Sequence, residues 1–182
     1  MSPASPQPVI RDAGPADIDI IRDLADRIWR QCYPGIITVE QIDYMLGWMY
    51  AAEKIRSEMT SCQAHYLLIS PTEAAPPAGF AAHGPGEAPG DWLLHKLYIE
   101  PAHQRTGLGS ALITAVLREA AQSGAKHLSL RVNRANAPAI GTYRRHGFVV
   151  MATDRADIGG GFVMDDYVMN RPIGPDTFLT NP

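Results

Sequence analysis

The sequence predicts an α/β fold arranged as one domain, and three observations carry that prediction. Its 182 residues match the usual size of a single domain, and 46% hydrophobic against 19% charged residues is a globular composition. Helical periodicity fills the first third of the chain, and strand-like patterns dominate from His65 onward. A glycine-containing loop then joins a long strand pattern to the strongest helix pattern.

Three helices are predicted before the first confident strand. Pro15 suits the first position of a helix whose apolar residues recur at helical spacing as far as Trp29. Thr38 followed by Gln41 matches a capping box and opens the second helix. A third helical segment is expected over residues 51–59.

The predicted strands are bounded by turn residues or alternate in polarity. Residues 127–132 alternate strictly, and the triple glycine at 159–161 predicts a hairpin turn. Two more helices are expected, over residues 108–123 and 138–145. The predicted strands cover residues 9–11, 65–70, 78–84, 91–99, 127–132, 148–153 and 162–170.

The ends of the chain differ from the rest in composition. We expect residues 1–8 to be a disordered lead-in, 9–172 a single domain and 173–182 a C-terminal tail. The first eight residues lack the basic and apolar regions of a secretory signal. No apolar run approaches the roughly 18–20 residues that span a membrane, so a cytoplasmic protein without membrane association is expected.

Charge and cysteine content narrow the class of function. A net charge of −3 argues against nucleic acid as a partner, because phosphate contacts need a basic surface. Cys32 and Cys62 have no CxxC or Cys/His ligand spacing, so we expect two buried thiols and no metal site.

The loop from Gln104 to Gly109 has the features of an anion site. It feeds into the strongest helix, whose first N–H groups have no partner inside the helix. Gly107 and Gly109 permit close approach of the backbone, and Ser110 adds a hydroxyl donor. Two glycines before a helix also fit an ordinary turn. The loop is not a Walker motif, and Leu112 stands where a dinucleotide fingerprint has its third glycine.

Two stretches resemble the GNAT superfamily of N-acetyltransferases. KLYIEPAHQRTGLGSALI, from Lys96, is similar to the acetyl-CoA-binding motif of that family. LSLRVNRANAPAIGTYRRHGF, from Leu128, is similar to its later strand–helix motif. The resemblance covers roughly residues 9–172. It implies a GNAT-like mixed, mostly antiparallel, twisted sheet of six or seven strands, with helices on both faces and a splayed coenzyme gap.

The resemblance also implies acetyl-CoA as the co-substrate, with no metal. The pyrophosphate would lie on the loop formed by Gln104, Arg105, Thr106, Gly107, Leu108, Gly109 and Ser110. The pantetheine arm would pair with the strand backbone at Leu97, Tyr98 and Ile99, where an N–H would also hold the thioester oxygen. Asn136 would contact the arm or brace the loop that does.

Tyr143 matches the usual general acid of the family. A phenol of pKa about 10 can protonate a leaving thiolate of pKa about 8–9, although the same residue also fits a core aromatic. The general base stays open between a water chain and four side chains, His95, Glu100, Asp165 and Asp166. Each carboxylate also fits a solvated surface group, and the histidine fits an ordinary strand residue.

The resemblance places amine recognition in the early helices and the late hairpin. An aromatic wall with acidic groups suits a cationic amine, and it would use Trp29, Tyr33, Tyr44, Met45, Trp48, Phe162, Asp165, Asp166 and Tyr167. The helical spacing of Trp29, Met45 and Trp48 equally fits a core. The stretches YPGIITVEQIDYMLGWMYAAEKI and DIGGGFVMDDYVMNRPI look like bacterial GNAT proteins related to polyamine acetyltransferases.

We therefore expect an acetyl-CoA-dependent N-acetyltransferase that transfers directly to a primary amine, such as a polyamine or another small cationic amine. The alternatives are a peptide or protein N-terminus, an aminoglycoside, and a non-catalytic acyl-CoA-binding regulator. The sequence has no GxSxG elbow for a covalent route. Many domains of this family dimerise, so a homodimer is also an expectation.

Overall fold

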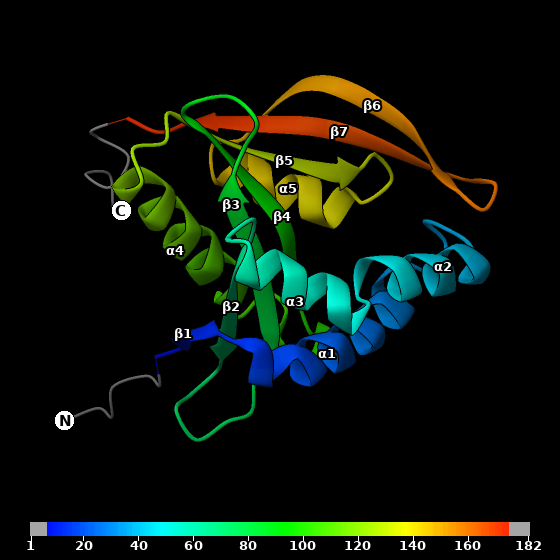
Figure 1. The fold of residues 1–182 in the computed structure, drawn as a ribbon, viewed down its shortest axis with the longest axis horizontal. Helices are drawn as coiled ribbons and strands as arrows, with labels where there is room; N and C mark the ends of the chain where they lie inside the picture. The colour runs from blue at the N-terminus through cyan, green and yellow to red at the C-terminus, as the bar shows by residue number, and fades with distance from the viewer. Residues whose placement is uncertain (1–6, 175–182) are drawn as a thin grey trace. The chain divides into compact units, whose positions relative to one another are not determined.

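A computed structural model describes residues 7–174, which form a mixed sheet with helices (Figure 1). The seven strands lie in the order β1-β2-β3-β4-β5-β7-β6. β4 and β5 are parallel, whereas β1–β2, β5–β7 and β6–β7 are antiparallel. The expected mixed, mostly antiparallel sheet is thereby confirmed. The strands are β1 (Val9–Ala13), β2 (His65–Ser70), β3 (Gly79–Pro85), β4 (Asp91–Ile99), β5 (His127–Asn133), β6 (Val149–Gly159) and β7 (Phe162–Pro172).

Five α-helices and two 3-10 turns are found within the described residues. They are η1 (Pro15–Asp17), α1 (Ile18–Cys32), α2 (Val39–Met49), α3 (Ala52–Thr60), η2 (Pro101–His103), α4 (Leu108–Gln122) and α5 (Ala137–Arg145). The predicted helices are confirmed to within a few residues. The expected disordered lead-in and C-terminal tail fall largely outside the described residues, and their disorder stays a prediction.

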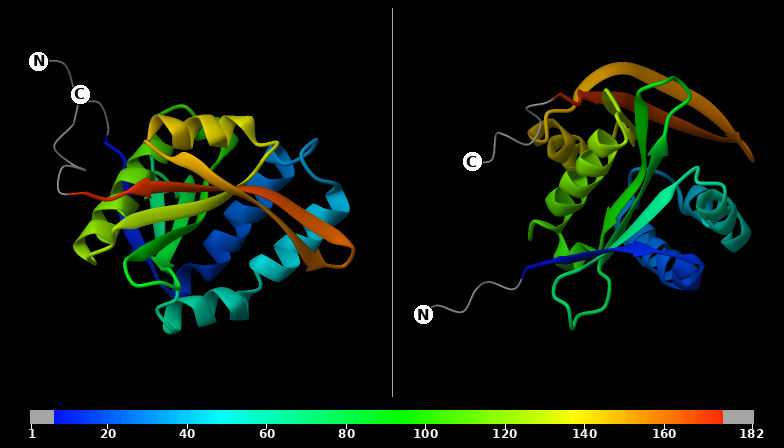
Figure 2. Two further views of the ribbon diagram at one scale, coloured as in Figure 1. Left: turned by 90° about the horizontal axis from the view of Figure 1, so that it is seen from above. Right: turned by 60° about the vertical axis from the view of Figure 1, so that its left-hand side comes forward.

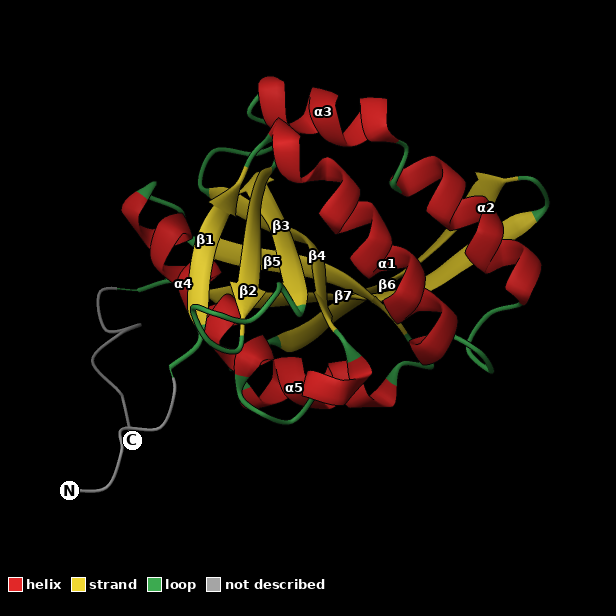
Figure 3. Ribbon diagram, turned by 90° about the horizontal axis from the view of Figure 1, so that it is seen from below, coloured by secondary structure: helices red, strands yellow, loops and turns green. Residues whose placement is uncertain are grey.

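The chain divides into two compact units. The first contains the residues up to Ala82 together with Lys96–Leu112, and the second contains His83–His95 together with the residues from Ile113 onward. In the first unit, β1 pairs with β2 from Val9 opposite Ser70 to Ala13 opposite Tyr66. Helix α1 packs against α2 and α3, and α3 contacts β2 (Figure 3).

The helices of the first unit follow from their sequence. The buried residues of α1 recur every three or four positions, which places one apolar face against the core. Thr38 Oγ1 accepts a hydrogen bond from the backbone N–H of Gln41 at 3.2 Å, so the predicted N-cap of α2 is confirmed. Ile42 and Met45 of α2 are buried.

A buried polar cluster connects three elements of the first unit. Lys96 of β4 is 5% exposed, and its Nζ lies 2.9 Å from Glu58 Oε2 on α3 and 2.7 Å from Tyr66 Oη on β2. Burial lowers the pKa of Lys96. Burial also favours a higher pKa at Glu58, but the Lys96 charge and the Tyr66 hydroxyl outweigh it and lower that pKa. The cluster is therefore an ion pair with a hydroxyl donor, in which Lys96 is buried and Glu58 is partly buried.

The second unit is organised around β5. β4 pairs with β5 from Asp91 opposite His127 to Leu94 opposite Leu130. β7 pairs with the whole of β5, and the β6–β7 hairpin extends beyond Asn133, the last residue of β5 (Figure 2). Gly159, Gly160 and Gly161 all have positive φ, which confirms the hairpin turn. Strand β6 is longer than predicted, because pairing with β7 extends it beyond its apolar start.

The structure also bears on the predictions for the two cysteines and for membrane-spanning segments. The expectation of two buried thiols is wrong, because Cys32 is partly exposed and Cys62 is exposed. Cys62 follows α3 in a turn with φ of 56°, away from any apolar helix face. Among residues 7–174, no helix is both long and apolar enough to cross a bilayer.

The buried cluster predicts a large effect of one substitution on stability. Glu58→Ala leaves Lys96 buried without its counter-charge, so the free energy of unfolding should fall by about 3–5 kcal/mol. Glu53→Ala on the same helix removes an exposed carboxylate and should change it by less than about 0.5 kcal/mol. Urea unfolding of both variants measures the difference. Equal effects would show that the cluster does not stabilise the fold.

The same cluster gives a pH dependence. A carboxyl whose pKa is lowered on folding stabilises the protein above its ordinary pKa, and that contribution is lost as the pH falls through the lowered value. We expect wild-type stability to decline below about pH 4.5, partly through Glu58. Thermal melts of Glu58→Gln across this range should decline less steeply. An unchanged acid slope would contradict the assignment.

Candidate functional site

The end of β4 presents alternate peptide groups to its two edges. The N–H of Glu100 donates to the carbonyl of Ala78 at 2.8 Å, so the peptide of Glu100 faces β3. Because peptide groups alternate along a strand, that of Tyr98 also faces β3 while those of Leu97 and Ile99 face the other edge. Leu97 and Ile99 therefore have the backbone orientation that pairing with an extended ligand requires, and Tyr98 does not.

The loop between η2 and α4 has the geometry of an anion-binding turn. Arg105 and Gly107 have φ of 61° and 93°, and left-handed residues of this kind form concave backbone nests for anions. A Cβ on Gly107 would meet nothing within 4 Å, and one on Gly109 would meet only Ile99 Cγ1, at 3.8 Å. Helix α4 has no acidic residue in its first turn, where the dipole is positive. These residues fit the expected pyrophosphate.

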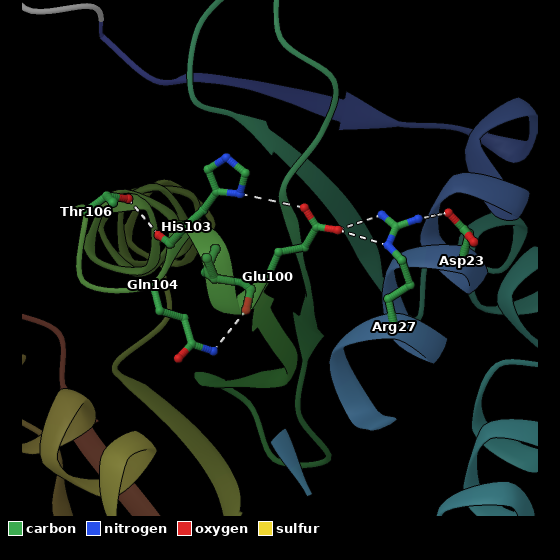
Figure 4. Close-up of polar contacts among 7 residues, drawn as sticks. Asp23, Arg27, Glu100, His103, Gln104 and Thr106 are labelled. Carbon is green, nitrogen blue, oxygen red and sulfur yellow. Dashed lines mark hydrogen bonds and ion pairs between the residues drawn. The ribbon is translucent and has the colours of Figure 1, made fainter. Parts of the chain in front are cut away.

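Side chains of the loop hold it against the end of β4 (Figure 4). Gln104 Nε2 donates to the carbonyl of Ile99 at 3.1 Å, and Thr106 Oγ1 donates to the carbonyl of His103 at 2.6 Å. Both side chains were expected to contact the coenzyme. In this structure both side chains hydrogen-bond within the protein and shape the loop.

Glu100 is fixed by an ion pair that the sequence did not signal. Its Oε1 accepts hydrogen bonds from Arg27 Nε at 2.9 Å and Nη2 at 2.7 Å, and Arg27 also contacts Asp23 (Figure 4). Its Oε2 lies 3.6 Å from His103 Nδ1. The pair joins α1 to the start of the loop, and no local pattern predicts a partner 73 residues away.

Asn136 and Tyr143 lie in the second unit, at the start and near the end of α5. Asn136 is the N-cap of the helix, and its Oδ1 accepts from the N–H of Ala139 at 3.3 Å. Tyr143 is 8% exposed and its ring packs edge-on against Phe148, with 5.7 Å between ring centres. Burial raises the pKa of Tyr143 to about 12, so its phenol stays protonated throughout the neutral range.

The four side chains considered as general base have different surroundings. His95 is exposed on β4, and Glu100 is committed to Arg27. Asp165 lies 3.2 Å from Arg134 Nη1. Asp166 is 2% exposed, so its interpretation as a solvated surface group is wrong. Burial raises the pKa of Asp166 to about 6.

The expected aromatic wall is partly core. Trp29 and Met45 are each 2% exposed, which confirms the core interpretation for these two residues. Trp48 is 46% exposed, with Lys54 Nζ 4.7 Å from its ring centre, so the core interpretation is wrong there. Tyr33 stacks on Trp29 at 4.4 Å. The partly exposed members of the wall are Tyr33, Tyr44, Phe162, Asp165 and Tyr167.

Two acetyltransferases are similar to this chain in sequence. Streptothricin acetyltransferase of Streptomyces lavendulae is 37% identical over 79 residues, a match that covers 43% of this chain and only 42% of that relative. Spermidine N(1)-acetyltransferase of Thermoplasma acidophilum is 24% identical over 158 residues, which covers 86% of this chain and 94% of the relative.

Solved structures share the fold. The PaiA N-acetyltransferase from Thermoplasma acidophilum, in complex with coenzyme A, has a TM-score of 0.78 at 22% identity and covers 91% of this chain and 99% of its own. The ribosomal-protein-S18-alanine N-acetyltransferase from Escherichia coli has a TM-score of 0.68 at 20% identity, covering 92% and 94%. The model of the "Acetyltransferase (GNAT) family" matches residues 23–148, which include the glycine loop and α5. The chain belongs to the acetyltransferase (GNAT) family.

Proposed function

We propose that the protein transfers the acetyl group of acetyl-CoA directly to a primary amine of a small cationic acceptor of the polyamine class. The observation that carries the coenzyme half of this proposal is the loop before α4. There, left-handed Arg105 and Gly107 and the unfilled space at Gly109 give a backbone cradle at a helix N-terminus. Membership of the GNAT family supports the same assignment.

Three groups take part in the proposed reaction, a backbone N–H of β4, the acceptor amine and Tyr143. The peptide groups of Leu97 and Ile99 face the edge of β4 away from β3. A backbone N–H on that edge would hold the thioester oxygen while negative charge develops on it. The amine nitrogen attacks the carbonyl carbon, the carbon–sulfur bond breaks, and Tyr143 gives its proton to the leaving thiolate. Because the burial of Tyr143 keeps the phenol protonated, the proton is in place at every working pH.

Two features support a small cationic acceptor. The similarity to spermidine N(1)-acetyltransferase extends over 86% of this chain and 94% of that protein, beyond the segment matched by the family model. The β6–β7 hairpin places Asp154 directly opposite Asp166, so two carboxylates lie side by side on neighbouring strands. Carboxylates pair favourably with ammonium groups. A homodimer and a cytoplasmic location stay predictions.

One assay tests the proposed function as a whole. Release of free CoA thiol from acetyl-CoA is measured against spermidine, short diamines, peptides with free N-termini and aminoglycosides. We expect saturable release with the polyamines and diamines. Saturable release with peptides alone would replace the acceptor class, and silence in protein that binds acetyl-CoA would favour a non-catalytic regulator.

The coenzyme assignment predicts the effect of Gly109→Ala. The added Cβ meets only one atom of the protein, at 3.8 Å, so the fold should be retained while the methyl group occupies ligand space. Calorimetric acetyl-CoA affinity should weaken at least about tenfold, or about 1.4 kcal/mol. Gly47→Ala in α2, whose Cβ would also find open space, is the matched control and should leave affinity unchanged. Unaltered binding by Gly109→Ala would refute the assignment.

The acid assignment predicts the effect of Tyr143→Phe. Phenylalanine keeps the ring that packs against Phe148, so melting temperature and acetyl-CoA affinity should stay close to those of the wild type. Loss of the phenol should lower kcat by about 100-fold or more. Steady-state kinetics with the amine found active measures the change. Wild-type kcat in this variant would exclude Tyr143 as the acid.

A further inference from the structure

Asp166 is a carboxyl group buried without full hydrogen bonding. It is 2% exposed, and its Oδ1 has no hydrogen-bond partner among residues 7–174. A buried carboxylate without partners is costly, and such groups in native proteins call for a functional explanation. Asp166 lies on β7, outside residues 23–148 matched by the family model, so the family match assigns it no role.

The strand register shows which groups surround Asp166. It lies directly opposite Asn133 on β5 and Asp154 on β6, and directly opposed residues share a face of the sheet. Arg131 lies two residues before Asn133 and therefore on that same face. Its Nε donates to Asp154 Oδ2 at 2.9 Å, so the nearby cation is engaged by Asp154.

The neighbouring Asp165 differs from Asp166 in the face of β7 on which it lies and in having a cation beside it. Successive strand residues point to opposite faces, so Asp165 lies on the other side of β7 from Asp166. Its two oxygens lie 3.2 and 3.4 Å from Arg134 Nη1. Asp165 is therefore a carboxylate with its own cation, whereas one oxygen of Asp166 lacks a partner within the described part of the chain.

The surroundings of Asp166 give it the protonation behaviour of a base that works near neutral pH. Burial has the largest effect on its pKa and raises it to about 6, Arg131 on β5 opposes this, and Asp154 on β6 and Asp165 on β7 add to it. The carboxylate is mostly ionised at pH 7 and holds a proton far better than an ordinary aspartate. Proton transfer is most efficient when the pKa of the catalytic group lies near the operating pH.

We propose that Asp166 binds the acceptor amine through its unpartnered oxygen and accepts the proton that the amine loses on acetylation. This inference rests on the proposed function. The nitrogen becomes positively charged as its bond to the carbonyl carbon forms, and its proton passes to the Asp166 carboxylate. The carbon–sulfur bond breaks and the thiolate takes a proton from Tyr143. The proton on Asp166 then returns through water to the tyrosinate, so amine and acetyl-CoA give only amide and CoA thiol.

The test compares pH profiles of kcat/KM for the wild type, Asp166→Asn and Glu87→Gln, with the amine found active. The wild type should show an acid limb with an apparent pKa near 6. Asp166→Asn should lose this limb and be about 100-fold slower at pH 7.5, with acetyl-CoA affinity unchanged. Glu87→Gln, which changes an exposed carboxylate of the second unit in the turn between β3 and β4, is the matched control; it should keep the limb and stay within about threefold of the wild type near neutral pH.

Two more variants separate a proton-accepting role from a merely structural one. Asp154→Asn removes a charge that raises the Asp166 pKa and releases Arg131, so it should move the acid limb to lower pH. Asp166→Glu keeps a carboxylate and should retain the limb at a reduced rate. An unmoved limb in Asp154→Asn would count against Asp166 as its source.

The outcomes distinguish the two proposals. An active wild type together with an Asp166→Asn variant of normal rate and normal acid limb overturns the role of Asp166 and leaves the proposed function standing. Loss of the limb in the control Glu87→Gln also overturns the role of Asp166, because the limb then does not depend on that residue alone. A wild type that binds acetyl-CoA yet acetylates no amine overturns the proposed function, and the role of Asp166 with it.

Discussion

The last residues of β4 are held by side chains from neighbouring elements, and the arrangement of the first unit depends on this. Lys96 is drawn toward α3 and β2 by Glu58 and Tyr66, and Glu100 is held by Arg27 of α1. The pairing of β4 with β5 ends at Leu94, so on that edge the rest of β4 has no partner strand among the described residues, and these side-chain contacts hold the end of the strand. The strand end is thereby stiffened while the peptide edge that carries Leu97 stays directed away from β3.

The same stiffening extends into the glycine loop. Gln104 attaches the loop to the carbonyl of Ile99, and the next residue, Arg105, is held at a positive φ that a side chain with a Cβ rarely adopts. Strain of this kind persists when the surroundings fix it, and it is concentrated at ligand sites. A loop that is already bent loses little conformational freedom when it binds an anion, so its rigidity contributes to affinity.

Local patterns predicted the elements well and the polar partners poorly. The N-cap at Thr38, the helix from Leu108 and the turn at Gly159–Gly161 each depend on residues close in sequence, so periodicity and turn chemistry are sufficient. Asp166 is buried and its neighbour Asp165 is partly exposed, yet nothing within the local sequence DDY distinguishes the two. The loop-bracing role of Gln104 depends on where β4 ends. The sequence therefore indicated the region of the candidate site, but not which of its side chains hold the loop in shape and which are buried.

Burial acts on two acidic groups of the second unit with opposite consequences. It raises the pKa of Tyr143 to about 12 and that of Asp166 to about 6, because a poorly hydrated surrounding disfavours both anions. For the phenol this ensures that a proton is present, although giving it to a thiolate of ordinary pKa about 8.5 is unfavourable before the carbon–sulfur bond begins to break. In the proposed mechanism, the Asp166 carboxylate takes a proton from the nitrogen that becomes the amide and returns it to the Tyr143 tyrosinate. In these proposed roles the proton moves from the group of lower pKa to the group of higher pKa, which is the direction that resets the site after each turnover.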